Sequence, residues 1–429
     1  MQQFNTFYIH SSEYFPNQNL VVFHYSFDKK EYFHEEIHLP ENHKIIWEEL
    51  NIVKNILFHV SIAFGISYYK LFPTQKIIVD SWKLDIDQKD YWKDFYIQWL
   101  WEFFYTNQID FTQLCNFESI WAILNADIDF SFSEKYLLPI GGWKDSIVSS
   151  IILEEQKIES TPFIFWKMDY IKEWFLKIYG QDALLITRQI DPKLFEMNTE
   201  WYYNGHVPIT WLISYFMTLI CYLYDYKYII FSNEKSANIW NTTLWELEIN
   251  HQYSKSLDFE NKISHYISKH ISSEIQYNSI LRDKYEIEIA KIFAEKWKKY
   301  FSVFSSCNTN FSMTKHSSNR WCNTCPKCLF VYIILRPFLT HDETLEIFSE
   351  ELYSRKDLLP LFKEIVWLSG IKPFECVWEI EEAQLWVYLS RKKYWPNLPI
   401  LLEYFSQNFN EYENIDYFLR LEKKYNLEL

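Results

Sequence analysis

The sequence predicts an α/β fold: a mostly parallel sheet with helices on both faces, an N-terminal α+β region and a helical C-terminal region. Three observations support this prediction. From about residue 131, short apolar runs typical of strands alternate with helical patterns, which favours parallel strands joined by right-handed crossovers. The preceding segment mixes helical and strand patterns, and the chain after about residue 258 has a helical pattern. We therefore expect three domains, at residues 1–130, 131–340 and 341–429.

The N-terminal region contains helical periodicity at residues 47–69 and 91–105 and a strand pattern at residues 76–80. No apolar run reaches the roughly 18 residues that cross a membrane. The best candidate, residues 209–223, is shorter and predicts a buried helix. The first residues lack a basic segment followed by an apolar one, so no export signal is predicted and we expect a cytoplasmic protein with no membrane partner.

The central region predicts a series of strands and helices. The strands lie at residues 136–140, 162–166, 183–187 and 227–231, and the helices at residues 145–155, 170–178 and 209–223. Ligands on such sheets bind at the carboxyl ends of strands. Residues 141–146 and 232–241 both follow predicted strands, so we expect them to line one crevice. Further helices are predicted at residues 285–300, 322–338 and 342–352.

The composition narrows the class of protein. The 429 residues are 48% hydrophobic and 20% aromatic, so the chain is globular rather than disordered. A net charge of −15 argues against a broad surface for nucleic acid, and we expect no nucleic-acid partner. Seven cysteines is an odd number, and without an export signal they indicate metal or thiol chemistry rather than a disulfide framework.

A glycine turn between a predicted strand and helix is the central feature of the sequence. Its backbone N–H groups suit a phosphate, with the Ser146 hydroxyl as a further donor. Lys144 would neutralise charge, and Asp145 would place Mg²⁺ or orient the loop. The alternative is a simple turn capped by Asp145, but the strand–turn–helix context favours phosphate. The residues are Gly141, Gly142, Trp143, Lys144, Asp145 and Ser146.

A cysteine cluster is the second motif. Cys322, Cys325 and Cys328 have the spacing that lets three thiolates bind one tetrahedral metal ion. Cys307 is the expected fourth ligand, with His316 in reserve. Four protein ligands would close the site, which predicts structural Zn²⁺, although iron–sulfur clusters use similar spacings. The alternative is a set of buried, inert thiols.

Polar segments after apolar ones supply candidate catalytic groups. Asn204-Gly205-His206-Val207-Pro208 predicts a rigid turn that presents Asn204 and His206, or simply a capped helix entry. Ser232, Asn233 and Glu234 follow a predicted strand directly, and the segment at residues 250–256 is similarly polar. The functional interpretation is a substrate site with acid/base groups, and the alternative is a solvated loop. The candidate acid/base groups in these two segments are Glu234, His251 and Lys255.

In their order, these motifs resemble a known family. Gly-Gly-x-Lys-Asp-Ser resembles the pyrophosphate loop of the ATP pyrophosphatase (PP-loop) superfamily. Together with Asn-Gly-His-Val-Pro, Asn-His-Gln-Tyr-Ser-Lys-Ser and Cys-x-x-Cys-Pro-Lys-Cys, it resembles the UDP-N-acetyl-α-D-muramoyl-L-alanyl-L-glutamate epimerases (MurL). The resemblance implies ATP-dependent inversion of the terminal L-Glu of the UDP-muramoyl dipeptide to D-Glu through a carboxyl adenylate, with release of AMP and pyrophosphate. This would be a step of peptidoglycan precursor synthesis, and so of cell-wall biogenesis, cell shape and cell division.

The resemblance also implies the division of labour in the site. Residues 141–146 would bind ATP with Mg²⁺. Proton transfer would fall to a pair among His206, Glu234, His251 and Lys255. Two alternatives remain: a superfamily ligase that modifies a nucleobase or tRNA, and a non-catalytic protein with the same fold. Substrate contacts would come from Asn204, Ser232, Asn233, Asn250 and Gln252.

Tryptophan stands where the family motifs have glycine. The chain holds 6 Gly and 19 Trp, whereas average usage of roughly 7% predicts about 30 Gly. Our hypothesis is that many of these tryptophans are glycines, encoded by UGA codons that the organism reads as glycine. An indole at residue 143 would then plug the nucleotide pocket. The alternative is a degenerate loop that no longer binds ATP. The departures are Trp143, Trp240, Trp245 and Trp378.

Overall fold

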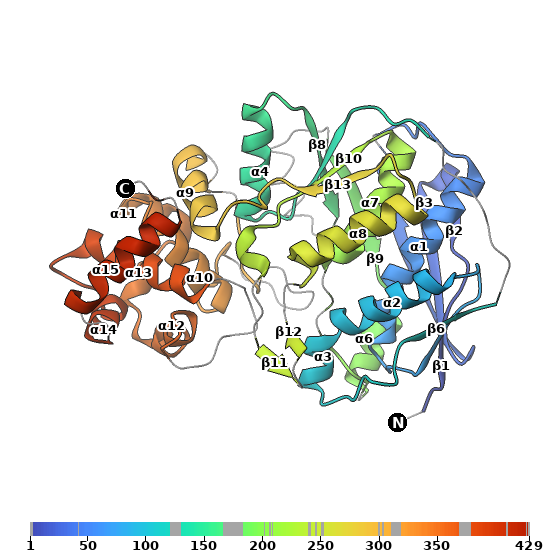
Figure 1. Ribbon diagram of the computed structural model, residues 1–429, viewed down its shortest axis with the longest axis horizontal. Helices are drawn as coiled ribbons and strands as arrows, with labels where there is room; N and C mark the ends of the chain where they lie inside the picture. Colours follow the sequence, from blue (N-terminus) through green and yellow to red (C-terminus); the bar gives the residue numbers. More distant parts are fainter. Residues whose placement is uncertain are drawn as a thin grey trace.

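A large mixed sheet runs through the described part of the chain (Figure 1). Its spatial order is β13-β10-β7-β8-β9-β4-β3-β1-β5-β6, with β2 paired to β3. The computed structural model describes residues 3–41, 43–120, 130–165, 183–200, 202–205, 207, 209–238, 242–244, 247–249, 253–298, 301–302, 304–309, 319–368, 379–408, 411–425 and 427. The strands are β1 (Thr6–Ile9), β2 (Glu13–Phe15), β3 (Leu20–Phe27), β4 (Glu31–His38), β5 (Lys76–Val79), β6 (Asn116–Ser119), β7 (Tyr136–Pro139), β8 (Ser160–Phe165), β9 (Leu184–Gln189), β10 (Tyr228–Phe231) and β13 (Gln276–Ser279), with β11 (Thr242–Leu244) and β12 (Leu247–Ile249) as a separate pair.

Strands β13, β10, β7, β8 and β9 are mutually parallel, whereas β4, β3 and β1 are joined by antiparallel pairing. Helices cover both faces of the parallel part, and alternate residues of β7 show this. Leu137 packs into the core shared with α1 (Leu50–Tyr69) and α7 (Ile209–Tyr224), while Leu138 packs with Leu153 of α4 (Lys144–Glu155). The predicted α/β class is confirmed.

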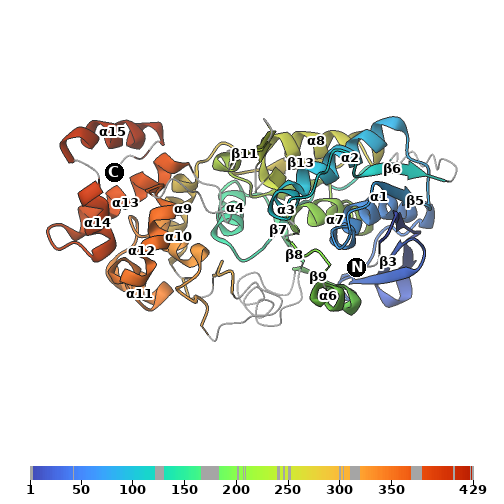
Figure 2. The same ribbon diagram turned by 90° about the horizontal axis from the view of Figure 1, so that it is seen from below.

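The remaining helices lie around this sheet or form a separate C-terminal group. Helices α9 to α15 gather at the end of the molecule opposite β3, β5 and β6 (Figure 2). They share a second hydrophobic core with the start of α4. The helices around the sheet are α2 (Ile86–Trp99), α3 (Trp101–Thr106), α6 (Pro192–Thr199) and α8 (Leu257–His270). The C-terminal group consists of α9 (Glu286–Lys296), α10 (Pro326–Leu335), α11 (His341–Phe348), α12 (Leu359–Ile365), α13 (Ile380–Tyr394), α14 (Ile400–Asn408) and α15 (Glu411–Lys424). The 3₁₀ turns are η1 (Pro16–Gln18), η3 (Lys235–Asn238), η4 (Tyr253–Lys255), η6 (Leu352–Ser354) and η7 (Lys356–Leu358).

Helix α1 is the one helix, within the described residues, long and apolar enough to cross a membrane by composition. The sequence pattern pointed instead to residues 209–223, which form the shorter α7. In the structure α1 packs against α7, and 78% of its most apolar window is buried inside the fold. It is therefore built as a core helix.

The N-terminal strands are joined to the central ones without a break, because β4 pairs with β9. A buried ion pair supports this joint: the Arg188 guanidinium of β9 donates to Glu35 of β4, whose side chain is fully buried. Arg188 also donates to the Ser67 hydroxyl of α1 at 2.9 Å. The sheet thus crosses the expected boundary at residue 130, and the boundaries at 130 and 340 stay predictions.

Several elements differ from the predictions. The segment after residue 258 is not wholly helical, because β13 extends the sheet beside β10. The predicted helix at 91–105 is two helices that meet at Leu100. The helix predicted at 322–338 begins only at Pro326, since the preceding residues form the cysteine loop. The helix predicted at residues 170–178 lies outside the described residues.

Candidate functional site

The glycine turn and the polar segment after β10 meet at one edge of the sheet. Strands β7 and β10 are parallel neighbours, with Tyr228 opposite Tyr136. From β7 the sheet continues through β8 to β9 on one side, while β10 and β13 lie on the other. A crevice forms at such a switch in strand order, outside the carboxyl ends of the strands. Ser149 of α4 donates to Ser232 at 2.7 Å, and the two segments contribute Lys144 and Glu234 to the lining of one pocket.

Three charged side chains lie together at the start of α4. The Lys144 ammonium contacts the carboxylate of its neighbour Asp145 and lies 2.5 Å from Oε1 of Glu286, the first residue of α9. Lys144 and Glu286 are 6% and 4% exposed. Burial alone would lower the pKa of Lys144, but the two carboxylates outweigh it and raise that pKa. Lys144 is therefore a permanent cation in this pocket.

The two carboxylates beside Lys144 differ in their pKa. Burial would raise the pKa of Asp145, but the positive charges of Lys144, Lys255 and Lys327 outweigh it and lower that pKa. Burial raises the pKa of Glu286 to about 7, with Lys144 opposing the rise and Asp145 and Glu234 adding to it. Asp145 is thus held ionised, and Glu286 can exchange a proton near neutral pH.

The pocket is lined by side chains from six segments, and the indole of Trp143 lies within it. Lys327 Nζ lies 4.3 Å and Lys255 Nζ 5.2 Å from the centre of the Trp143 ring. The space left is about 20 Å³, roughly the room of one water molecule. The charges suit a phosphate, but a polyphosphate needs the indole to be displaced or absent. The lining residues include Trp143, Lys144, Asp145, Glu234, Lys255, Glu286 and Lys327.

The backbone conformation of the glycine turn accounts for glycine at only one of its positions. Gly142 has a φ of 82°, a left-handed conformation that favours glycine. Trp143 has a φ of −88° and caps the start of α4 in an extended conformation that any residue adopts. Backbone geometry therefore does not require glycine at residue 143. The space that the indole takes in the pocket is what supports the glycine hypothesis there. Ser146 donates to the Trp143 carbonyl at 3.0 Å, which closes the turn.

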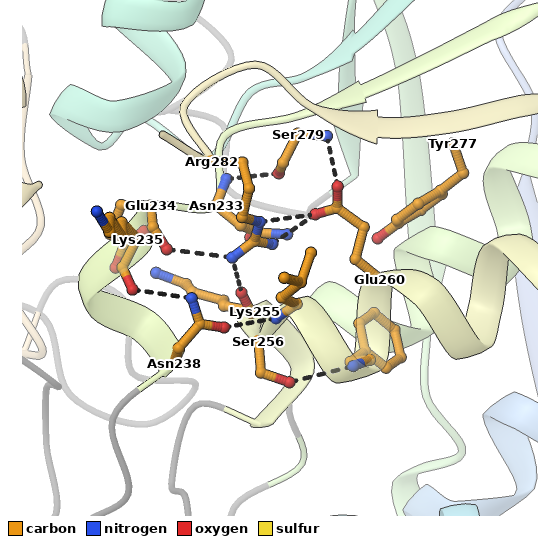
Figure 3. A network of polar contacts seen from close by, with 12 residues as sticks. Asn233, Glu234, Lys235, Asn238, Lys255, Ser256, Glu260, Tyr277, Ser279 and Arg282 are labelled. Carbon is orange, nitrogen blue, oxygen red and sulfur yellow. Dashed lines mark hydrogen bonds and ion pairs between the residues drawn. The ribbon is translucent and has the colours of Figure 1, made fainter. Parts of the chain in front are cut away.

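Arg282 fixes the two candidate acid/base segments relative to each other (Figure 3). Its guanidinium donates to the backbone carbonyl of Glu234 at 3.2 Å and to that of Lys255 at 2.9 Å. The same guanidinium is held by Glu260 of α8, with Nη2 2.5 Å from Oε2. Glu260 also accepts from the Ser279 N–H at the end of β13. Glu234 and Lys255 lie 21 positions apart in the sequence and are thus positioned by one partly buried network.

Two buried carboxylate oxygens on the pocket wall have no hydrogen-bond partner among the described residues, namely Oε2 of Glu234 and Oε2 of Glu286. Nδ2 of Asn233, which is not part of the pocket lining, also has no partner within these residues. The three residues are 2–4% exposed, and such atoms cost free energy unless something binds them. Carboxylate oxygens are the ligands that Mg²⁺ prefers, so the residues present fit a divalent cation.

The cysteine cluster lies beside the pocket at the start of α10. The Sγ atoms of Cys307, Cys322, Cys325 and Cys328 all lie within 4.8 Å of one another, as the spacing predicts. Sγ of Cys322 and Sγ of Cys328 are 3.8 Å apart. A zinc–sulfur bond of 2.3 Å in a tetrahedron gives sulfur atoms about 3.8 Å apart, so the four thiols fit Zn²⁺. The identity of the metal stays a prediction.

The remaining predicted residues are not in the pocket or lie outside the described residues. Asn204 is exposed and is not part of the pocket lining. Its neighbour Gly205 packs so closely that a Cβ would lie 2.7 Å from the Phe103 ring. The predicted site residues that lie outside the described part of the chain are His206, Asn250, His251, Gln252 and the reserve ligand His316. The tryptophans Trp240, Trp245 and Trp378 also lie outside it.

Two charged residues of the pocket were not identified from the sequence. Glu286 begins α9 and belongs to no motif, so only the fold brings it to Lys144. Lys327 stands inside the cysteine motif, whose spacing predicts a metal site but assigns no role to the residues between the thiols. The available signal was a lysine between two candidate metal ligands.

Comparisons with known proteins cover most of the chain. A family model described as the MurL N-terminal domain matches residues 1–280, and one described as the MurL C-terminal domain matches residues 303–416. The UDP-N-acetyl-alpha-D-muramoyl-L-alanyl-L-glutamate epimerase of Xanthomonas oryzae pv. oryzae is 32% identical over 321 residues, 75% of this chain and 71% of that protein. Proteins of the same name from Micromonospora sp. and Salinispora tropica are 33% and 34% identical over 62% of this chain. The chain spans only 59% and 58% of the length of these two relatives.

Proposed function

The chain belongs to the MurL family, and from that premise we propose that it is an ATP-dependent epimerase of peptidoglycan precursor synthesis. Its substrate would be the UDP-muramoyl dipeptide ending in L-Glu, which it converts to the D-Glu form, in the cytoplasm. The observation that carries the proposal is the meeting of Lys144, Asp145 and Glu234 in one pocket at the ends of adjacent strands. Membership of the PP-loop superfamily is part of the same proposal.

The chemistry explains why an epimerase would use ATP. A carboxylate resists loss of its α-proton, because the product gathers negative charge on a group that is already anionic. Adenylation of that carboxyl removes its charge and makes the Cα–H more acidic. A base then removes the proton and an acid returns one on the other face. Hydrolysis of the adenylate releases the inverted product with AMP, and pyrophosphate has already left.

The residues of the pocket suit these roles. Lys144 and the N–H groups at the start of α4 would bind the phosphates, and Asp145, with its lowered pKa, would hold Mg²⁺. Glu234 is buried, its backbone is fixed by Arg282, and one of its carboxylate oxygens has no partner in the described part of the chain, which suits an acid/base residue. Lys255 reaches the same pocket and is the second described candidate. We also propose that Zn²⁺ in the cysteine cluster has a structural role.

The decisive experiment is an incubation with ATP, Mg²⁺ and the L-Glu form of the muramoyl dipeptide, followed by chiral analysis of the glutamate and quantification of AMP. It is run on this chain and on its Trp143→Gly variant, in which the pocket is open. We expect D-Glu and AMP to appear together in the open variant. Glu234→Gln should abolish both proton exchange at Cα and epimerisation, whereas Glu295→Gln, an exposed carboxylate on α9, should leave them unchanged.

Two outcomes contradict the proposal. If the open variant forms no D-Glu and converts no ATP to AMP, the proposed epimerase function is excluded. AMP release on addition of a nucleobase acid instead of the dipeptide assigns the chain to a nucleobase- or tRNA-modifying ligase.

A further inference from the structure

The phosphate pocket contains a third lysine that comes from the cysteine cluster. Lys327 is the second residue of α10 and stands between Cys325 and Cys328. It is 6% exposed, and its Nζ lies over the Trp143 ring at 4.3 Å. Lys144 reaches the same pocket from the start of α4 and Lys255 from η4. Three cations therefore approach one space from three separate elements.

We infer that Lys327 binds the polyphosphate in this pocket, and that a metal ion in the cysteine cluster holds it in place. This inference deepens the proposed function and rests on it. The positive charge of Lys327 already acts on this pocket, because it helps to lower the pKa of Asp145. The cysteine motif also restrains Lys327. Its backbone is fixed on both sides by cysteines whose Sγ atoms converge within 4.8 Å, so a bound metal ion leaves Lys327 little freedom to turn away.

The charges on the pocket wall specify the ligand. The carboxylates of Asp145, Glu234 and Glu286 face the same space as the three lysines. A bare anion would meet repulsion from these carboxylates, and a bare cation would meet repulsion from the lysines. A diphosphate or triphosphate carrying Mg²⁺ supplies both charges, because its oxygens bind the ammonium groups and its cation binds carboxylates.

Calorimetric binding of magnesium pyrophosphate to the metal-loaded full chain tests the inference, with and without Trp143→Gly. Lys327→Ala should weaken binding roughly 10- to 100-fold, the loss expected for one charge-assisted contact. Lys356→Ala, an exposed lysine on η7, removes the same charge from the C-terminal part of the chain and should leave affinity unchanged. Cys322→Ser should weaken binding as Lys327→Ala does, and the double variant should bind no more weakly than either.

A second measurement does not depend on the folding of Cys322→Ser. In protein loaded with Co²⁺ at the cysteine cluster, magnesium pyrophosphate should shift the cobalt–thiolate absorption. The shift should be absent from Lys327→Ala.

Three results overturn the inference: no pyrophosphate binding in either background, undiminished affinity of Lys327→Ala, or additive effects of Lys327→Ala and Cys322→Ser. The proposed function fails separately. If pyrophosphate binding depends on Lys327 but the protein does not epimerise the dipeptide, the inference stands and the epimerase function is excluded. If the protein is an active epimerase and Lys327→Ala binds pyrophosphate normally, the epimerase function stands and the inference is wrong.

Discussion

Helix α12 ends at a position built for glycine but occupied by Trp367. The φ of Trp367 is +62°. The Leu368 N–H donates to the Lys363 carbonyl at 2.7 Å, and the Trp367 N–H donates to the Glu364 carbonyl at 3.3 Å. This pair of bonds is the Schellman motif, whose left-handed residue is usually glycine. A residue with a Cβ incurs about 1–2 kcal/mol in that conformation, which glycine adopts freely.

The comparison of Trp367→Gly with Trp367→Ala isolates this backbone effect. Both variants remove the same indole, so they lose the same packing and differ only by the Cβ. Glycine relieves the strain of about 1–2 kcal/mol, whereas its greater freedom in the unfolded chain opposes this by about 0.4–1 kcal/mol. We therefore expect the glycine variant to unfold with a free energy about 1 kcal/mol above that of the alanine variant, measured by urea denaturation.

Trp47 provides the matched control. Both tryptophans are 39% exposed, but Trp47 has no left-handed backbone. At Trp47 the order should reverse, with alanine more stable than glycine. An alanine variant at least as stable as the glycine variant at residue 367 would refute the reasoning. Peptide mass spectrometry of protein from its native source reads residues 143 and 367 directly. Our hypothesis expects glycine at both, and tryptophan there contradicts it.

Three further predictions follow from buried charges and the cysteine cluster. Arg188→Met should lower the free energy of unfolding, measured in urea, by about 3–5 kcal/mol, because the fully buried Glu35 loses its partner. The double variant with Glu35→Leu should recover most of this free energy. A double variant less stable than Arg188→Met alone would contradict this reasoning. Burial raises the pKa of Glu382 from 4.5 to about 8, so the stability from its neutral form is complete below pH 4.5 and is lost as the pH rises through 8. Glu382→Gln should remove this dependence, measured as urea midpoints across that range; an unchanged pH profile would show that other groups cause it. Elemental analysis should find one zinc ion per chain, lost in Cys322→Ser but kept in Cys221→Ser, whose thiol is buried in the other core; equal zinc in both variants excludes the cluster as its site.

The sequence predicted the elements whose signals are local. Strands β7 and β10 are unbroken apolar runs, and the turn and the polar segment after them follow immediately. The rule that parallel strands share an edge then brings Lys144 and Glu234 together. The cysteines are equally local, because three of the four stand within seven residues.

The features that escaped prediction depend on contacts distant in sequence or lack an apolar pattern. The pair between Glu35 and Arg188 joins residues 153 positions apart, and no pattern in either strand signals it. Strand β13 reads Gln-Tyr-Asn-Ser and buries only Tyr277 and Ser279, so its sequence resembles a loop. Glu286 becomes a pocket residue only because β13 turns α9 back toward α4.

The first turn of α9 connects the C-terminal helices to the pocket. Its Ile287 N–H donates to Glu382 of α13 at 3.2 Å, and the other oxygen of Glu382 accepts from Ser236, just beyond Glu234. The Glu286 carboxylate in the same turn contacts Lys144. Displacement of α13 would leave this turn without its acceptor and would shift Glu286 against Lys144. A small molecule wedged between α13 and α9 would therefore disturb the pocket without entering it.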